Sequence, residues 1–294
     1  MGIKFRGLFE ISMVNLFWGF GFVATVWALE SFSLLQILAL RFSIVGLVGV
    51  GLLLLKERKR CKELLKMTFV PALLLMMELL FQAWGLKHTS ATKAGFITIM
   101  YIVLVPMLEG LFWKRKIRTS HWLWVSLAVI GTLLIVKLQS FDVSFGDFLM
   151  LISALGASLH ILSIDRIGKD EDDLFVANTL QSFWAAIIVL PILLSQESLL
   201  PAAISWKSAV GLTSLTLGTT LLGFYFQMRA QKTLSPSISS MMFLLESPIS
   251  AGFAYYLLAE RLNILQWTGC ALILLAALGV TLQNQKEKAT VHFV

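Results

Sequence analysis

Three ionisable side chains lie inside long apolar stretches of the sequence. Glu78, Glu246 and His160 each share a helical face with small or polar residues, at spacings of three and four. A charge at the centre of a membrane costs at least about 2.5 kcal/mol, so residues of this kind are candidates to line a water-filled path. The carboxylates could bind a cationic group or exchange protons, and the imidazole could hydrogen-bond a solute or relay protons.

A structural role stays open for the same residues, because a carboxyl or an imidazole inside a helix bundle can serve only to hydrogen-bond a neighbouring helix. Trp18 likewise could face the path or pack closely against Gly19. The polar and aromatic residues that we expect to approach the path are Trp18, Asn15, Gln82, Tyr101 and Ser239.

Two further charged residues are expected to have structural roles. Arg41 lies only a few residues into the second apolar stretch, where a long basic side chain can reach the interface or cap a neighbouring helix. Contact between Arg41 and a substrate stays open as a second interpretation. Glu109 lies near the end of the fourth stretch and is expected to pair with Arg115.

Ten apolar stretches carry these residues, and each is about long enough to cross a bilayer, which needs roughly 20 residues of helix. The sequence is 57% hydrophobic and only 14% charged, which excludes a water-soluble domain. The stretches are too long and too continuously apolar for barrel strands, so we predict an all-α membrane protein with ten transmembrane helices. The approximate ranges are 8–29, 34–55, 67–86, 94–113, 121–138, 146–164, 174–196, 207–228, 235–258 and 265–283.

The net charge of +7 is explained by topology rather than by a nucleic-acid partner. With the N-terminus inside the cell, 18 of the 24 Lys and Arg fall on the cytoplasmic side, as the positive-inside rule requires. We therefore predict a multi-pass protein of the cytoplasmic (inner) membrane, with both termini cytoplasmic. The basic run from Lys56 to Lys66 is interpreted as part of this signal, with some contact to anionic lipid.

The two halves of the sequence match each other at a spacing of about 145 residues. Each half holds five stretches, an odd number, so the halves must have opposite orientations in the membrane. We predict two domains, 1–140 and 141–294, in a 5+5 inverted repeat. The matching segments are 86–91 with 231–236, 106–110 with 248–252, and 116–122 with 261–267.

Several short motifs occur in order along the chain, among them Trp18-Gly19, Arg41-Phe42, the run 87–98, Leu245-Glu246-Ser247-Pro248 and Trp267-Thr268-Gly269. Together they resemble the drug/metabolite transporter superfamily and, within it, the ten-helix EamA-type exporters. The resemblance implies a secondary transporter whose central cavity is formed mainly by helices 1, 3, 4, 6, 8 and 9. It also implies export of amino acids or similar small polar solutes. Many relatives have Glu-Pro where this chain has Glu246-Ser247-Pro248. The substrate of any one relative should therefore not be assigned to this chain.

A carrier is favoured over the other classes of function. No ATP-binding loop of the form GxxxxGK[ST] occurs, so alternating access would be driven by a proton or substrate gradient. An intramembrane enzyme is disfavoured because HExxH and GxSxG are both absent, and a channel because no filter motif or ring of charges is evident. Within the carrier class, import or exchange of a cationic metabolite such as choline or S-adenosylmethionine is the alternative to export.

The expected partners follow from this interpretation. We expect a small-molecule substrate and membrane lipid, with protons as candidate coupling ions. We expect no nucleic acid, cofactor, metal ion or catalytic residue. The protein is expected to act as a monomer or a homodimer.

Overall fold

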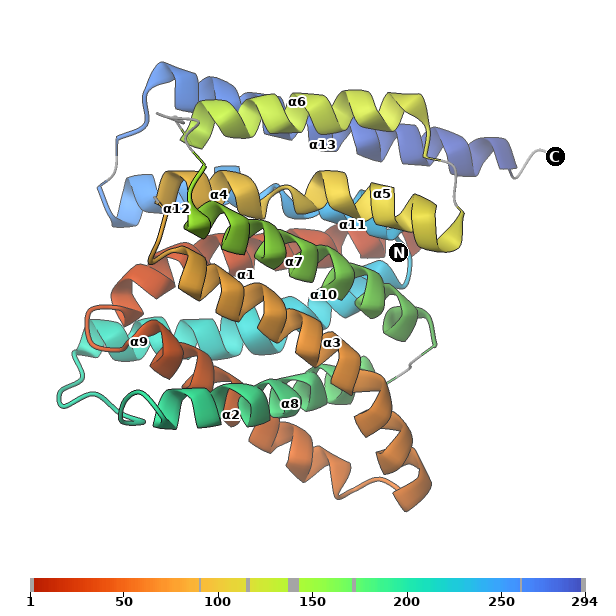
Figure 1. Cartoon of the computed structure of the whole chain (residues 1–294). Helices are drawn as coiled ribbons and strands as arrows, with labels where there is room; N and C mark the ends of the chain where they lie inside the picture. Colours follow the sequence, from red (N-terminus) through yellow and green to blue (C-terminus); the bar gives the residue numbers. More distant parts are fainter. Residues whose placement is uncertain are drawn as a thin grey trace.

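The structure is a computed structural model in which every regular element of the described residues is a helix (Figure 1). The prediction of an all-α membrane protein is confirmed, since eight of the apolar helical stretches in this part of the chain are long enough to cross a bilayer and α6 (Thr119–Val136) supplies a shorter one. The predicted boundary between the halves, after residue 140, lies outside the described residues. These are 3–89, 91–114, 117–136, 143–170, 173–259 and 261–291, with the backbone alone for 3–5, 91–92, 136, 168–170 and 284–291.

Seven of the ten predicted segments form one helix each, and three are divided. The undivided helices are α1 (Ile3–Ala28), α2 (Leu34–Leu53), α3 (Arg58–Gly85), α6, α7 (Phe145–Asp170), α8 (Leu174–Leu194) and α13 (Ile264–Val291). The divided segments are α4 (Ala91–Thr98) with α5 (Tyr101–Trp113), α9 (Trp206–Ser214) with the π-helix η1 (Leu215–Gly223) and α10 (Phe224–Gln231), and α11 (Pro236–Phe243) with α12 (Glu246–Leu257).

The fourth and ninth segments break at corresponding places. The breaks fall at residues 99–100 and 244–245, which lie at the spacing of the sequence repeat. At both breaks, backbone bonds that span three residues replace some of the bonds that span four. The first residue after each break is Tyr101 in one segment and Glu246 in the other.

The break in the ninth segment has a local cause. Pro248 has no N–H and so cannot donate to the carbonyl of Leu244, its partner in a regular helix. That carbonyl instead accepts a bond from the N–H of Ser247, at 3.1 Å. The chain therefore tightens at this point, and a new helix begins with the side chain of Glu246 in its first turn.

The contacts between the ten segments have an internal symmetry. If each segment is replaced by the one five places away along the chain, the main pairs of segments in contact stay the same. α2 packs along α8 and α6 along α13, and these two pairs form opposite edges of the bundle (Figure 1). Between these edges, α3 packs on α7 as α1 packs on α9, η1 and α10. Likewise α1 contacts α12 as α7 contacts α4. The segments that carry the predicted site residues therefore lie in the middle of the bundle.

Two glycines allow the backbones of paired helices to approach closely. A Cβ atom at Gly46 of α2 would lie 2.6 Å from the Cα of Phe183 in α8, which is too close for any other residue. A Cβ atom at Gly156 of α7 would lie 2.8 Å from the backbone nitrogen of Glu78 in α3. Small residues at such contacts are how membrane helices gain van der Waals packing. Gly156 thereby fixes the distance between α7 and the helix that carries Glu78.

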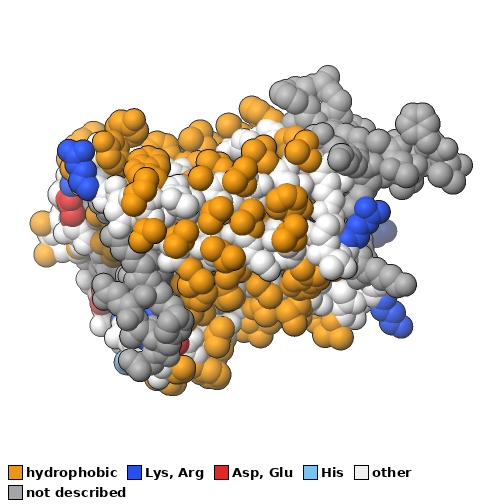
Figure 2. All heavy atoms as spheres, turned by 90° about the horizontal axis from the view of Figure 1, so that it is seen from above, with side chains coloured by type: hydrophobic (Ala, Val, Ile, Leu, Met, Phe, Trp, Pro, Cys, Tyr) orange, Lys and Arg blue, Asp and Glu red, His pale blue; other side chains and the backbone are white. Residues whose placement is uncertain are grey.

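The surface agrees with a bilayer around the middle of the molecule. Apolar side chains cover the centre of the face in Figure 2, and charged side chains lie toward its two ends. On the helices at this edge, Leu123 of α6 is 64% exposed and Leu278 of α13 is 60% exposed. Such exposed apolar side chains are stable against lipid rather than water. The protein is therefore a multi-pass membrane protein.

Candidate functional site

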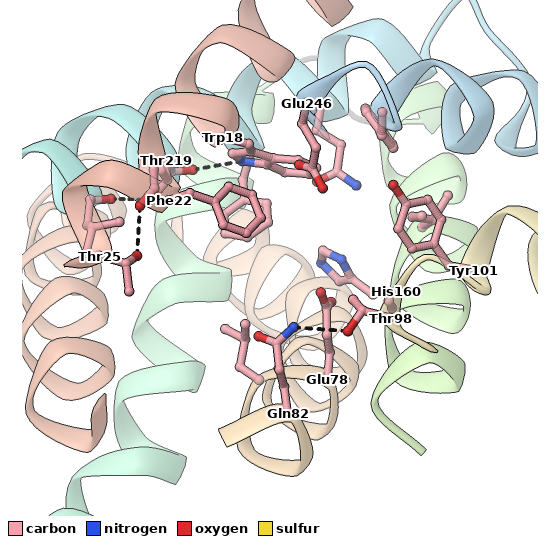
Figure 3. Close-up of a pocket in the computed structure, with 18 of the residues that line it drawn as sticks. Trp18, Phe22, Thr25, Glu78, Gln82, Thr98, Tyr101, His160, Thr219 and Glu246 are labelled. Carbon is pink, nitrogen blue, oxygen red and sulfur yellow. Dashed lines mark hydrogen bonds between the residues drawn. The ribbon is translucent and has the colours of Figure 1, made fainter. Parts of the chain in front are cut away.

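A cavity of about 250 Å³ lies in the middle of the bundle, between segments of both predicted halves (Figure 3). Its walls come from α1, α3, α4, α5, α7, η1, α10, α11 and α12, which are the six segments that the resemblance implied, with one residue added by α2. Six of the eight predicted site residues line it: Trp18, Glu78, Gln82, Tyr101, His160 and Glu246.

Two carboxylates point into the cavity from opposite sides. Glu78 comes from the middle of α3 and Glu246 from the start of α12, and Figure 3 shows their side chains directed toward each other. They are close enough to interact electrostatically. No protein group in the described part of the chain hydrogen-bonds either carboxylate. Both are therefore open to a cationic group of a solute.

Arg41 also lines the cavity, which corrects the interpretation that it reaches the interface or caps a helix. Its guanidinium interacts electrostatically with Glu78 and lies 4.8 Å from the centre of the Phe42 ring. The Nε atom is buried without a hydrogen-bond partner. The cavity thus contains one fixed cation beside two carboxylates, and the fork of a guanidinium suits a carboxylate ligand.

His160 is held in a defined orientation at the cavity wall. Its Nε2 atom lies 3.0 Å from Oε1 of Gln181 in α8, and its ring packs edge-on against Phe224 of α10 at 5.8 Å between centroids. The imidazole is only 2% exposed. One ring nitrogen is thus occupied by the protein. The other is the one that could meet a solute or a proton.

Aromatic rings form much of the remaining wall. The Nε1 atom of Trp18 donates to the carbonyl of Thr219 in η1, at 3.4 Å, and its ring packs against Phe224 and Phe243 at centroid distances of 5.5 and 5.3 Å. Phe22 is 57% exposed and lies in the cavity (Figure 3). A π-helical stretch such as η1 often marks a functional position in a helix. The indole therefore links α1 to that irregular stretch.

Polar groups are contributed by the fourth segment and by α3. The Nε2 atom of Gln82 donates to the hydroxyl of Thr98 in α4, at 3.5 Å. Tyr101 places its phenol opposite Trp18 across the cavity (Figure 3) and interacts electrostatically with Glu246 and Glu78. The break in the fourth segment thus places the hydroxyl of Tyr101 at the cavity. The break in the ninth segment places the carboxylate of Glu246 there in the same way.

The structure places the other two predicted site residues behind the wall. The Nδ2 atom of Asn15 donates to the carbonyl of Met242 at 3.0 Å and to that of Ile11 at 2.9 Å, so it ties α1 to the end of α11 beside the break. Ser239 is fully buried in α11. Neither residue lines the cavity, and Asn15 positions the chain that leads to Glu246.

Glu109 contacts the ninth segment of the chain. It is 2% exposed, and its carboxylate accepts hydrogen bonds from the hydroxyl and the backbone N–H of Ser237 at the start of α11, the latter at 3.1 Å. Arg115, the predicted partner, lies outside the described residues. Glu109 therefore joins the fourth and ninth segments.

The cavity extends toward one end of the bundle and is closed toward the other. Thr25 and Gln82 line it within a turn of the ends of α1 and α3. On the opposite side, beyond the lining residue Gln227, Arg229 of α10 donates to the buried carboxylate of Glu10 in α1 at 2.7 Å. Arg6 donates to the same oxygen at 3.0 Å. This ion pair joins α1 to α10 at the end where the chain begins.

The lining of the cavity offers partners for groups of both signs of charge. Among the described residues there is no group of three or more His, Cys, Asp or Glu side chains that could hold a metal ion. The cavity has ionic groups, hydrogen-bond donors and aromatic walls, which are the features of a small-molecule site.

Comparison with known proteins gives the family of the chain. The sequence matches the EamA-like transporter family twice, over residues 5–137 and 144–282. The chain belongs to the EamA-like transporter family. The predicted relationship to the drug/metabolite transporter superfamily is thus confirmed, and the family's two matched regions correspond to the two sets of five segments.

The individual EamA-like relatives have less than 30% sequence identity to this chain. An "uncharacterized transporter" of Archaeoglobus fulgidus is 28% identical over 275 residues, covering 93% of this chain and 85% of that protein. The threonine/homoserine exporter RhtA of Escherichia coli K12 is 29% identical over 186 residues, which are 62% of this chain and 61% of RhtA. A protein of known crystal structure has the same fold, with a TM-score of 0.79 at 15% identity over 95% of this chain and 98% of that one.

Proposed function

We propose that this EamA-like transporter exports a small zwitterionic metabolite, an amino acid or a close relative, across the cytoplasmic membrane by alternating access. The observation that carries the proposal is a cavity in the middle of an apolar bundle, where one guanidinium and two carboxylates face the same space. A charge inside a membrane segment is costly, so such residues usually face a solute or ion path. The likeness to RhtA supports amino acids as the substrates and export as the direction.

The pattern of charge fits the two ends of an amino acid. Arg41 would hold the carboxylate of the substrate through its planar fork of donors. Glu246 would hold the ammonium group, and Glu78 interacts electrostatically with both residues. The rings of Trp18 and Phe22 would contact the substrate side chain. His160 and Tyr101 would complete the wall with hydrogen-bonding groups.

Alternating access follows from the proposed inverted repeat of residues 1–140 and 141–294. The inverted repeat is supported by helix contacts that are equivalent in the two sets of five segments. The corresponding breaks before Tyr101 and Glu246 also support it. Two related halves can rock around a fixed site, which makes the inward-open and outward-open forms similar in energy. The one-sided cavity is then one of these two forms.

The orientation and the driving force are part of the same proposal. The end of the bundle where α1 begins carries the basic loops, so both termini would lie in the cytoplasm. The ion pair of Glu10 and Arg229 would then close the cytoplasmic side. A proton or substrate gradient would drive transport, with Glu246, and secondarily Glu78, as the groups that carry a coupling proton.

Uptake or exchange of a cationic metabolite such as choline or S-adenosylmethionine is the second candidate. It is favoured by the excess of carboxylates over guanidinium in the cavity and by aromatic faces that can bind an organic cation. In this case Arg41 would serve Glu78 rather than the substrate.

Reconstituted flux tests the proposal. Proteoliposomes containing the purified protein are loaded with unlabelled threonine, and the entry of radiolabelled threonine is followed, with choline-loaded vesicles as the matched control. We expect saturable uptake that threonine inside the vesicle stimulates and choline does not. Entry of radiolabelled choline that internal choline stimulates, without threonine counterflow, would support the second candidate. Unsaturable flux would instead indicate a channel. If counterflow were absent for both threonine and choline, transport of both solutes would be contradicted.

A further inference from the structure

A second cavity, of about 510 Å³, lies between α3, α5 and α7, toward the end of the bundle where α1 begins. None of the candidate site residues lines it. It opens at the molecular surface, where Val70 of α3 is 53% exposed and Phe112 of α5 is 56% exposed. Most of its lining is apolar. This groove therefore lies along helices that face the lipid.

Both charged residues in the lining of this groove are basic: Lys66 and Arg166. Arg166 lies with its guanidinium 5.0 Å from the centre of the Trp113 ring, which holds it at the groove. Neither cation has an acidic partner in the described part of the chain. The groove thus offers two unneutralised positive charges beside an apolar wall.

The two charges lie where the apolar part of each helix ends, which is where a lipid headgroup is expected. Lys66 immediately precedes the apolar part of α3, and Arg166 lies in the last turns of α7 at the same end of the bundle. From there the groove continues over Val70 and Phe112 into the apolar zone. A ligand that fits must combine an anionic head with a hydrocarbon chain. A soluble anion would leave the apolar length of the groove uncovered.

We propose that the groove is a binding site for one anionic phospholipid. The phosphate lies between Lys66 and Arg166, and an acyl chain follows Val70 and Phe112 toward the middle of the membrane. Basic pockets between transmembrane helices are how proteins recognise anionic headgroups. The proposal depends on the chain's spanning a membrane and on no property of transport, so its failure would leave the proposed function untouched.

Lipid binding to the purified protein tests the site directly. The full chain is exchanged into detergent with phosphatidylglycerol or phosphatidylcholine, and bound lipid is counted by native mass spectrometry across a concentration series. The wild type should prefer phosphatidylglycerol. In the double variant Lys66→Gln and Arg166→Gln, the ratio of phosphatidylglycerol to phosphatidylcholine affinity should fall about fivefold for each charge removed. Each basic side chain near an anionic surface contributes a free energy of about that size.

The matched control is Arg58→Gln with Lys62→Gln, which removes one Arg and one Lys from exposed positions of α3 outside the groove. It should keep the wild-type preference. Equal losses in both double variants, or no loss in the first, would overturn the proposal. A photoreactive phosphatidylglycerol analogue provides a test without any variant. Cross-links should map to α3, α5 and α7 around Trp113, and cross-links confined to other helices would also overturn it.

Discussion

Arg41 changes the chemistry of the cavity more than any other single residue. Without it, the space would contain two carboxylates and would suit a cation. With it, the same space offers partners for both charged groups of a zwitterion. The choice between the two candidate functions therefore depends on whether the guanidinium contacts the solute or only Glu78.

Replacing Arg41→Gln separates these possibilities. If the guanidinium holds the substrate carboxylate, threonine affinity should fall about 10- to 100-fold, which corresponds to the loss of a hydrogen bond to a charged group. An analogue of threonine that lacks the carboxylate should bind equally to both proteins. Substrate-dependent thermal shifts of the purified proteins measure the two affinities. Equal losses for both ligands would show that Arg41 acts through the site and not on the carboxylate. Arg41→Lys, which keeps the charge without the fork, should retain part of the affinity.

Glu246 is the residue to test for proton coupling. Glu246→Gln keeps the size and polarity of the side chain but removes its titration, so the pH dependence of threonine flux should become flat. Initial rates in vesicles over a range of pH measure this. Glu109→Gln is the control, because Glu109 is a buried carboxyl that bonds Ser237 outside the cavity. It should lower stability and leave the pH profile unchanged. Full activity of Glu246→Gln with the wild-type profile would exclude this role.

At the residue scale, the sequence points most directly to the cavity lining where a membrane makes an ionisable side chain costly. Glu78, Glu246 and His160 lie deep in apolar segments, and all three reach the cavity. Arg41 was misjudged because its place near the start of a helix resembles that of a residue reaching the interface. Asn15 shares the polar face of α1 but does not line the cavity, because its amide bonds neighbouring carbonyls. Helical periodicity identifies a polar face, but it does not say which amide is used in this way.

At the scale of elements, the two breaks are the feature that the sequence predicted least well. Residues 99–100 and 244–245 are all apolar, so no local polarity marks either break. The one available signal was Pro248, which removes the bond to the carbonyl of Leu244. Pro106 lies too far beyond its own break to explain it in the same way. The ten segments themselves were predictable, since a bilayer requires a certain length of apolar helix.

Close packing of α3 on α7 should be needed for the site. In Gly156→Ala, the added Cβ would meet the backbone of Glu78, which cannot turn aside, so the two helices must separate. We expect a loss of about 1 to 3 kcal/mol in the free energy of unfolding, as for other overpacked positions. Weaker threonine binding should accompany it, because α3 and α7 carry Glu78 and His160. Denaturation in detergent and binding assays measure the two effects.

Gly51→Ala is the matched control for that change. A Cβ at Gly51 would meet nothing within 4 Å, although the residue also lies inside a helix. Alanine should there be neutral, or stabilising by at most about 1 kcal/mol, because it has the higher helix propensity. If Gly156→Ala behaved in the same way, the approach of α7 to α3 would not constrain the site.

At the scale of the whole molecule, the cavity has one open and one closed side, and an ion pair marks the closed one. Arg6 and Arg229 donate to the same oxygen of Glu10, but they differ in what they join. Arg6 is in α1 with Glu10, whereas Arg229 belongs to α10 and so connects two helices that come from different predicted halves of the chain. In alternating access, only the second contact must open when the substrate passes.

Arg229→Gln should therefore shift the protein toward the form that opens at the Glu10 end. A charged hydrogen bond of about 1.5 kcal/mol, lost from one form alone, changes the ratio of the forms about tenfold. Thr25→Cys reports this ratio, because Thr25 lines the open part of the cavity. Its rate of reaction with a membrane-impermeant thiol reagent should fall in Arg229→Gln. In Arg6→Gln it should stay near the parent rate, because the Arg6–Glu10 pair lies within α1 and joins no second helix. Equal rates in all three proteins would mean that this ion pair does not control access to the cavity.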